Sequence, residues 1–224
     1  IIFATLTFIL DTRSKRNMFP RGATDITTEL GAIYGILFFG SIVLAIVNTY
    51  STYYLQALHG VSPLVAGYLF AIQSLMWTAS ALVVANLARN LETASIVTGL
   101  LFMLLATISI ALTVDLGPVL IIAIGIGLTG LGLGATNNPI IQRIIAIVPK
   151  SENHMAGTSV QTIRNIGISF GAAASGMVAS TAGLTEDSGR EMIAPAMQWV
   201  YGVNAGFAVL ACLMLIPHLT ARHI

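Results

Sequence analysis

A long stretch without formal charge is the feature that most constrains this chain. Between Glu29 and Arg89 there is no lysine, arginine, aspartate or glutamate. An ionised side chain at the centre of a bilayer costs roughly 2.5 to 3.5 kcal/mol on insertion scales, so membrane helices avoid such residues. A soluble protein with a large core would still need a charged surface, because soluble domains carry about 25% charged residues. Only 8% of this chain is charged, which predicts an all-α polytopic membrane protein.

Turn residues divide the chain into six apolar lengths that can each form a membrane span. A helix needs about 20 apolar residues to cross a bilayer. Pro63 and Pro118 suit the first turn of a helix, where the missing N–H costs nothing. The predicted spans are residues 30–58, 63–87, 94–113, 118–142, 154–182 and 196–216.

The first ten residues, "IIFATLTFIL", are apolar and follow neither a Met nor a basic segment. They resemble neither a signal peptide nor a natural start. We therefore expect residues 1–10 to be the tail of an upstream membrane helix and the sequence to be a fragment. Residues 11–29 would then form a linker, and residues 217–224 a tail.

Basic residues fall on alternate sides of this layout. Cytoplasmic loops of membrane proteins carry an excess of lysine and arginine. One side has a single basic residue, Arg190, whereas the other has Arg13, Lys15, Arg16, Arg21, Arg89, Arg143, Lys150 and Arg222. The sequence thus predicts a multi-pass protein of the cell (inner or plasma) membrane, with the linker and the C-terminus in the cytoplasm.

Polar side chains mark one face of several predicted spans. Tyr34, Ser41 and Asn48 recur every seven residues, which drifts only about 20° per step around a helix. In lipid such groups cost less when they face protein or a water-filled cavity. They predict a substrate pathway, and hydrogen bonds between helices are the alternative that stays open. The pathway candidates are Tyr34, Ser41, Asn48, Thr52, Gln73, Trp77, Asn137, Asn138 and Gln161. The third span has only Ser and Thr as polar residues and is predicted to face lipid.

The fourth span contains "GIGLTGLGLGATNNP", a glycine-rich run. Gly130 and Gly134 form a small-xxx-small pair that permits close approach of a neighbouring helix. A nucleotide-binding loop is excluded, because no strand precedes the run and no Lys-Ser/Thr ends it. Pro139 is a candidate interruption of the helix, and the two asparagines before it suit either an inner gate or a packed helix end.

Arg164 is the only charge well inside a predicted span. If its helix enters the bilayer near Gly157, Arg164 is about 10 Å deep at 1.5 Å per residue. Its side chain could reach back to the cytoplasmic surface or pair with a group in the interior, and the sequence leaves both open. Gly167 and Gly171 follow as a seam of small residues for a neighbouring helix.

Two segments resemble a known family. The hairpin "YYLQALHGVSPLVAGY" resembles the Tyr-Leu-Gln, Gly-x-Ser-Pro and Ala-Gly pattern of the fourteen-helix drug:proton antiporters of the major facilitator superfamily. The segment "GLGLGATNNPIIQRIIAIVPKSENHMAGTSVQTIRNIGISFGAAASG" looks like a later region of the same family. The residues predicted to serve helix packing or gating are Gln56, Gly60, Pro63, Gly130, Gly134, Arg164, Gly167 and Gly171.

The resemblance implies the C-terminal six-helix half of a two-half bundle, with the substrate cavity between the halves and alternating access by rocking. The first, second, fourth and fifth spans would line the cavity, and the third and sixth would face lipid. Protons are implied as the coupling ion, although the family's coupling carboxylates lie mainly in the N-terminal half. That half is missing here and is expected on the same polypeptide. Twelve-helix relatives fit the layout equally well.

These observations favour proton-coupled efflux of small amphipathic compounds. A transporter for another solute, such as a sugar or metabolite, and a six-helix channel or scaffold are the alternatives. A serine enzyme built on Ser175 is not expected, because every histidine lies in a loop or tail, out of reach of a Ser–base dyad. No His/Glu metal constellation or cofactor motif is present, and the net charge of +1 gives no reason to expect nucleic acid.

Overall fold

The computed structural model describes residues 19–20, 22–115, 117–185 and 188–220, apart from the side chains of residues 89 and 220. This part of the chain is helical and contains no strand, which confirms the predicted all-α class. The long helices are α2 (Glu29–His59), α3 (Pro63–Ala85), α4 (Glu92–Thr113), α5 (Val119–Ile147), α6 (Asn153–Thr181) and α7 (Arg190–Leu213). Shorter helices are η1 (Arg89–Leu91), η2 (Lys150–Glu152) and α8 (Leu215–Thr220). The predicted upstream tail, residues 1–10, lies outside the described residues.

Among the described residues, five helical segments are long and apolar enough to cross a membrane: α2, α3, α4, α5 and residues 190–219. Helix α6 has 29 residues but carries more polar side chains than the others, so it falls short by composition. Five long apolar helices are typical of a polytopic membrane protein, which agrees with the prediction from the sequence. Crossing by α6 and the sidedness of the loops remain predictions.

The turn between α2 and α3 follows from local sequence. Gly60 has a φ of 62°, which a glycine adopts without strain, and its N–H donates to the Gln56 carbonyl oxygen at 3.2 Å. Ser62 caps the next helix by accepting a hydrogen bond from the Val65 N–H at 3.3 Å, and Pro63 occupies the first turn. The Gly-x-Ser-Pro motif is therefore a helix stop followed by a helix start.

Two helices extend beyond the predicted spans. Helix α5 passes through Pro139 without interruption and continues to Ile147, past the predicted end at Gln142. Helix α7 begins at Arg190, before the predicted start at residue 196. Apolar length indicates where a helix crosses lipid, whereas hydrogen bonding can continue into the charged residues beyond. The neighbours of a proline in a membrane helix can satisfy the backbone carbonyl that it leaves free.

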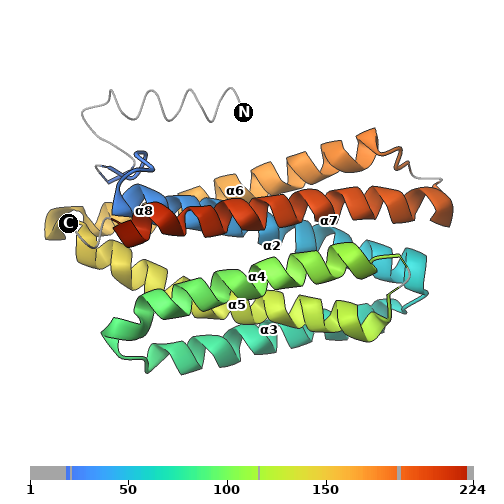
Figure 1. Ribbon diagram of the computed structural model, residues 1–224, viewed down its shortest axis with the longest axis horizontal. Helices are drawn as coiled ribbons and strands as arrows, with labels where there is room; N and C mark the ends of the chain where they lie inside the picture. Colours follow the sequence, from blue (N-terminus) through green and yellow to red (C-terminus); the bar gives the residue numbers. More distant parts are fainter. Residues whose placement is uncertain (1–18, 21, 116, 186–187, 221–224) are drawn as a thin grey trace.

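The long helices lie side by side along one axis and form two groups (Figure 1). Helix α5 packs against α3 and α4, helix α2 packs against α6 and α7, and α4 contacts α7. The contacts of α5 with α3 and α4 therefore match those of α2 with α6 and α7. In this correspondence α2, α3 and α4 are equivalent to α5, α6 and α7. Helices α2 and α5 run in opposite directions, because Glu29 at the start of α2 meets Arg143 near the end of α5. This is the pattern of an inverted internal repeat.

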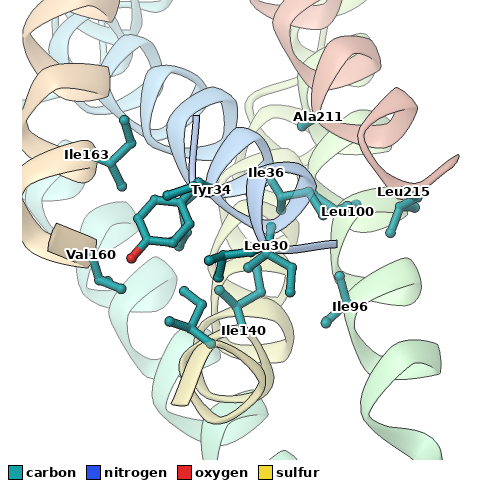
Figure 2. Close-up of a cluster of buried hydrophobic side chains, with 14 of the residues drawn as sticks. Leu30, Tyr34, Ile36, Ile96, Leu100, Ile140, Val160, Ile163, Ala211 and Leu215 are labelled. Carbon is teal, nitrogen blue, oxygen red and sulfur yellow. The ribbon is translucent and has the colours of Figure 1, made fainter. Parts of the chain in front are cut away.

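The core consists of two clusters along the bundle axis. One contains Leu30, Leu100 and Ile140 from three helices, together with Ala211 and Leu215 from the C-terminal region (Figure 2). The second lies toward the other end of α2 and includes Ile46, Tyr54, Ile110, Ile126 and Tyr201. The surface is also apolar: Leu105, Leu112 and Trp199 are 56%, 79% and 67% exposed on α4 and α7. An apolar surface of this kind is suited to contact with lipid. The exposed side chains of α3 are mostly apolar as well.

Candidate functional site

A partly open cavity of about 220 Å³ is lined by residues of α2, α3, α4, α5 and α6. Its polar lining comes from α2, α3, α5 and α6: Ser41, Trp77, Thr136, Asn137, Gln161 and Arg164. Most of the remaining wall is apolar, including Leu37, Leu100, Met103 and Ile140. Four of the nine predicted pathway residues therefore line this cavity, and so does Arg164, which was predicted to serve packing or gating.

Arg164 reaches from α6 across to α5, where its guanidinium donates a hydrogen bond to the Asn137 side-chain oxygen. The side chain is half-buried and lines the cavity. The sequence left open whether Arg164 reaches back to the cytoplasmic surface or pairs with a group in the interior. The structure shows the interior pairing. The partner is a neutral amide, so the positive charge is hydrogen-bonded without being neutralised.

The other polar groups of the cavity have different hydrogen-bond states. The Ser41 hydroxyl donates to the Leu37 carbonyl oxygen at 2.6 Å, within its own helix. The Gln161 amide donates to Asn165 at 3.0 Å, on an exposed face of α6. Trp77 is half-buried at the cavity wall. The cavity thus offers one cation, amide groups and an aromatic ring within mainly apolar walls.

Glycines allow the helices around the cavity to pack closely. A Cβ added at Gly130 or Gly134 of α5 would overlap a backbone carbonyl oxygen of α3, that of Gln73 or Trp77 respectively. A Cβ at Gly167 of α6 would lie 2.6 Å from the Phe38 carbonyl oxygen on α2, and one at Gly171 would lie 3.0 Å from Ile42. Backbone contact of this kind requires residues without a side chain.

Several predicted pathway residues do not line this cavity. The Tyr34 hydroxyl is 2.5 Å from the Ser159 hydroxyl, and Figure 2 shows it pointing toward α6 near Val160. Gln73 is buried, and its Nε2 has no hydrogen-bond partner among the described residues. Asn48 is exposed and Thr52 half-buried on α2.

Asn138 also lies apart from the cavity that Asn137 lines. It borders a separate, shallower hollow of about 350 Å³ with Ser74 and Thr78 of α3, and Trp77 contributes to both hollows. The two neighbouring asparagines therefore line different hollows of the bundle. The predicted pathway stripe separates into a cavity group, buried helix-to-helix contacts and an exposed face.

A charged cluster that the sequence reasoning missed links three helices. Glu29 accepts a hydrogen bond from Arg143 Nε at 2.6 Å and lies 3.4 Å from His218 Nδ1. Glu29 and Arg143 are only 16% and 18% exposed. The signal was available: an acid at the start of one long helix and a base at the end of another, both predicted on the same side of the membrane.

The opposite end of the bundle is held by hydroxyl, aromatic and imidazole groups together with Arg190. The Ser51 and Tyr201 hydroxyls are 2.7 Å apart, and Tyr54 packs edge-on against Tyr201. His59 Nε2 lies 2.8 Å from the Val114 carbonyl oxygen. Arg190 donates to the Leu58 carbonyl oxygen at 2.9 Å. No periodicity in the sequence indicated these contacts.

The described residues contain no group of three or more histidine, cysteine, aspartate or glutamate side chains able to hold a metal ion. Ser175, the residue considered for nucleophilic chemistry, is buried, and its hydroxyl donates to the Gly171 carbonyl oxygen at 2.7 Å.

Comparison with known proteins gives one informative similarity. The chain matches no family model. Over 126 residues it is 31% identical to the riboflavin transporter RibZ of Clostridioides difficile (strain 630). The matched region is 54% of this chain and 27% of that protein, so the match spans about a quarter of the relative's length. The chain is thus distantly related to a membrane transporter.

Proposed function

We propose that this chain is the C-terminal six-helix half of a major facilitator superfamily transporter that moves small amphipathic compounds by alternating access. Efflux coupled to protons is the proposed mode, and the cell membrane is the proposed location. The distant relationship to a transporter and the apolar helices support membrane transport in general. The superfamily and the proton come from the resemblance of the two sequence segments.

The observation that carries this proposal is the mixed polar and apolar cavity between α2, α3, α5 and α6. It lies beside α2 and α5, the two helices that correspond in the internal repeat. Secondary transporters bind their substrates near the interface of such repeats, close to the middle of the membrane. A volume of about 220 Å³ is below the roughly 300–1,000 Å³ typical of ligand pockets. A facing half of the protein would complete the site.

We propose transport rather than catalysis. The described polar groups of the cavity are a guanidinium, amides, hydroxyls and an indole, and Ser175 lies outside it. Recognition of a solute needs no more than these groups. The carboxylates that couple transport to protons would come from the facing half.

Dye efflux tests this proposal in cells that express the complete reading frame encoding the chain. We expect efflux to stop when a protonophore collapses the gradient. Trp77→Ala and Asn137→Ala should each reduce efflux on the order of tenfold at equal expression, because the cavity residues contact the moving solute. Asn48→Ala is the matched control, since Asn48 is exposed and outside the cavity. Efflux that is indifferent to the protonophore would contradict proton coupling.

The similarity to RibZ favours a second candidate, transport of a flavin or another planar vitamin-like solute. The Trp77 ring at the cavity wall would suit a flat aromatic system, because aromatic rings stack with an offset. Riboflavin fluorescence inside and outside the same cells distinguishes the two candidates. Riboflavin movement that is lost in Trp77→Ala, without movement of dyes, would favour this second function.

A further inference from the structure

Arg164 differs from the other arginines whose side chains are described. Arg143 lies 2.6 Å from the Glu29 carboxylate, and Arg190 lies 3.9 Å from the Asp115 carboxylate. Arg164 has no carboxylate within ion-pair distance among the described residues, and its hydrogen bond goes to the neutral Asn137 side chain. Of the three arginines whose side chains the structure describes, Arg164 lacks a counter-charge, and it is the one that lines the cavity.

An uncompensated charge at this position is expensive. A buried ion is stabilised only when it is both hydrogen-bonded and paired with an opposite charge. Ionisable residues inside membrane helices therefore mark substrate or ion pathways, with a partner expected nearby. The hydrogen bond that Arg164 donates to Asn137 holds the guanidinium in the cavity, but it leaves the charge available to an incoming anion.

We propose that Arg164 binds an anionic oxygen group, a carboxylate or phosphate, on the transported solute, and that the aromatic body of that solute lies against Trp77. This assignment deepens the proposed transport function and rests on it. A guanidinium has five N–H donors in a planar fork, so one bond to Asn137 leaves donors for a two-point contact with a carboxylate or phosphate.

The remaining walls fit the same class of solute. Leu37, Met103 and Ile140 are apolar, and Trp77 provides an aromatic face. A solute with a flat apolar body and one negative end would satisfy the apolar walls and the cation together. The substrate class is therefore an amphipathic aromatic acid. The competing source of negative charge is a carboxylate elsewhere in the complete protein, which would occupy Arg164 permanently.

Equilibrium dialysis of the complete purified protein in detergent separates these two sources. The probes are 2-naphthoate and 2-naphthamide, which share one ring system and differ in charge. We expect the wild-type protein to bind the acid about tenfold more tightly than the amide, a difference of about 1.4 kcal/mol. Equal affinity for the two, or no binding of either, would overturn the assignment. This comparison uses no variant and is independent of any effect on folding.

Variants then assign the preference to one residue. Arg164→Gln should bind acid and amide equally, whereas Arg164→Lys should keep part of the preference because it keeps the charge. Arg190→Gln is the matched control: it removes an arginine at the far end of the bundle and should leave the preference unchanged. A preference for the acid that persists in Arg164→Gln would also overturn the assignment.

Flux measured on the same preparations in proteoliposomes distinguishes failure of this inference from failure of the proposed function. Dye flux without a preference for the acid would support transport and overturn the role of Arg164. A preference for the acid that depends on Arg164, without flux of either probe or of dyes, would support the anion site and contradict transport.

Discussion

Two helix pairs of this bundle, α3–α5 and α2–α6, pack through glycines in the same way but with different tightness. In each pair one helix presents two glycines four residues apart to backbone carbonyl groups of the other. Against α3, a Cβ at Gly130 or Gly134 would overlap the facing carbonyl oxygen. Against α2, a Cβ at Gly167 would also be too close, at 2.6 Å from the Phe38 oxygen, but one at Gly171 would be 3.0 Å from Ile42. The glycine spacing is equal, so the spacing alone does not determine how closely two helices pack.

The difference has a structural consequence at the cavity. The tighter pair carries Trp77 on α3 and Asn137 on α5, whereas the looser pair carries Ser41 on α2 and Arg164 on α6. The α3–α5 seam therefore has no room for a side chain at either glycine, whereas the α2–α6 seam is less tight at Gly171. Three glycine substitutions test this comparison, and variants of one ion pair test the contact between the two helix groups.

The largest effect is expected for Gly130→Ala in the tight seam. Overpacking in a core typically costs about 1–3 kcal/mol, and here the obstacle is a backbone oxygen that cannot rotate away. We expect the free energy of unfolding to fall by about 3 kcal/mol, with loss of monodisperse protein. Size-exclusion chromatography and thermal unfolding in detergent would measure this. A variant that unfolds like the wild type would remove the basis of the comparison.

The next effect concerns the contact that joins the two helix groups, Glu29 on α2 with Arg143 on α5. Glu29→Gln leaves a largely buried guanidinium without its counter-charge, and we expect it to lower the free energy of unfolding by about 2 kcal/mol. The double variant with Arg143→Gln should recover part of that loss, because no charge is then unpaired. Thermal unfolding of both single variants and the double variant gives the coupling. Strictly additive losses would argue against the ion pair.

A smaller effect is expected for Gly171→Ala in the loose seam. The new methyl group would approach Ile42 at 3.0 Å, a contact that a shift of a few tenths of an ångström can relieve. We expect a loss of about 1 kcal/mol, measured by the same unfolding assay as for Gly130→Ala. A loss equal to that of Gly130→Ala would show that the two seams are equally tight.

The smallest effect is expected for Gly202→Ala on α7. Gly202 is exposed, and no atom lies within 4 Å of an added Cβ. Alanine favours a helix over glycine by up to about 1 kcal/mol in water, so stability should stay unchanged or rise slightly. This variant is the matched control for the other two glycine substitutions. A clear destabilisation would indicate a partner that covers this face of α7.

The sequence was sufficient where a property depends on neighbouring residues. The absence of charge between Glu29 and Arg89 predicted long apolar helices. Gly60, Ser62 and Pro63 indicated where one helix stops and the next starts, because a left-handed cap, a side-chain cap and a proline act within one turn. Helix ends that extend past the apolar residues, as at Ile147 and Arg190, were predicted less well.

Only the tertiary structure decided which polar residues meet. Periodicity places Ser41 and Asn48 on one stripe of α2, yet the first lines the cavity and the second is exposed. The contact of Arg164 with Asn137 joins positions 27 residues apart, and that of Glu29 with Arg143 joins positions 114 apart. Helical periodicity defines a face of a helix, but what covers that face depends on the crossing of other helices. Those crossings depend on backbone contacts between residues distant in sequence, such as Gly130 with Gln73, which a local pattern does not encode.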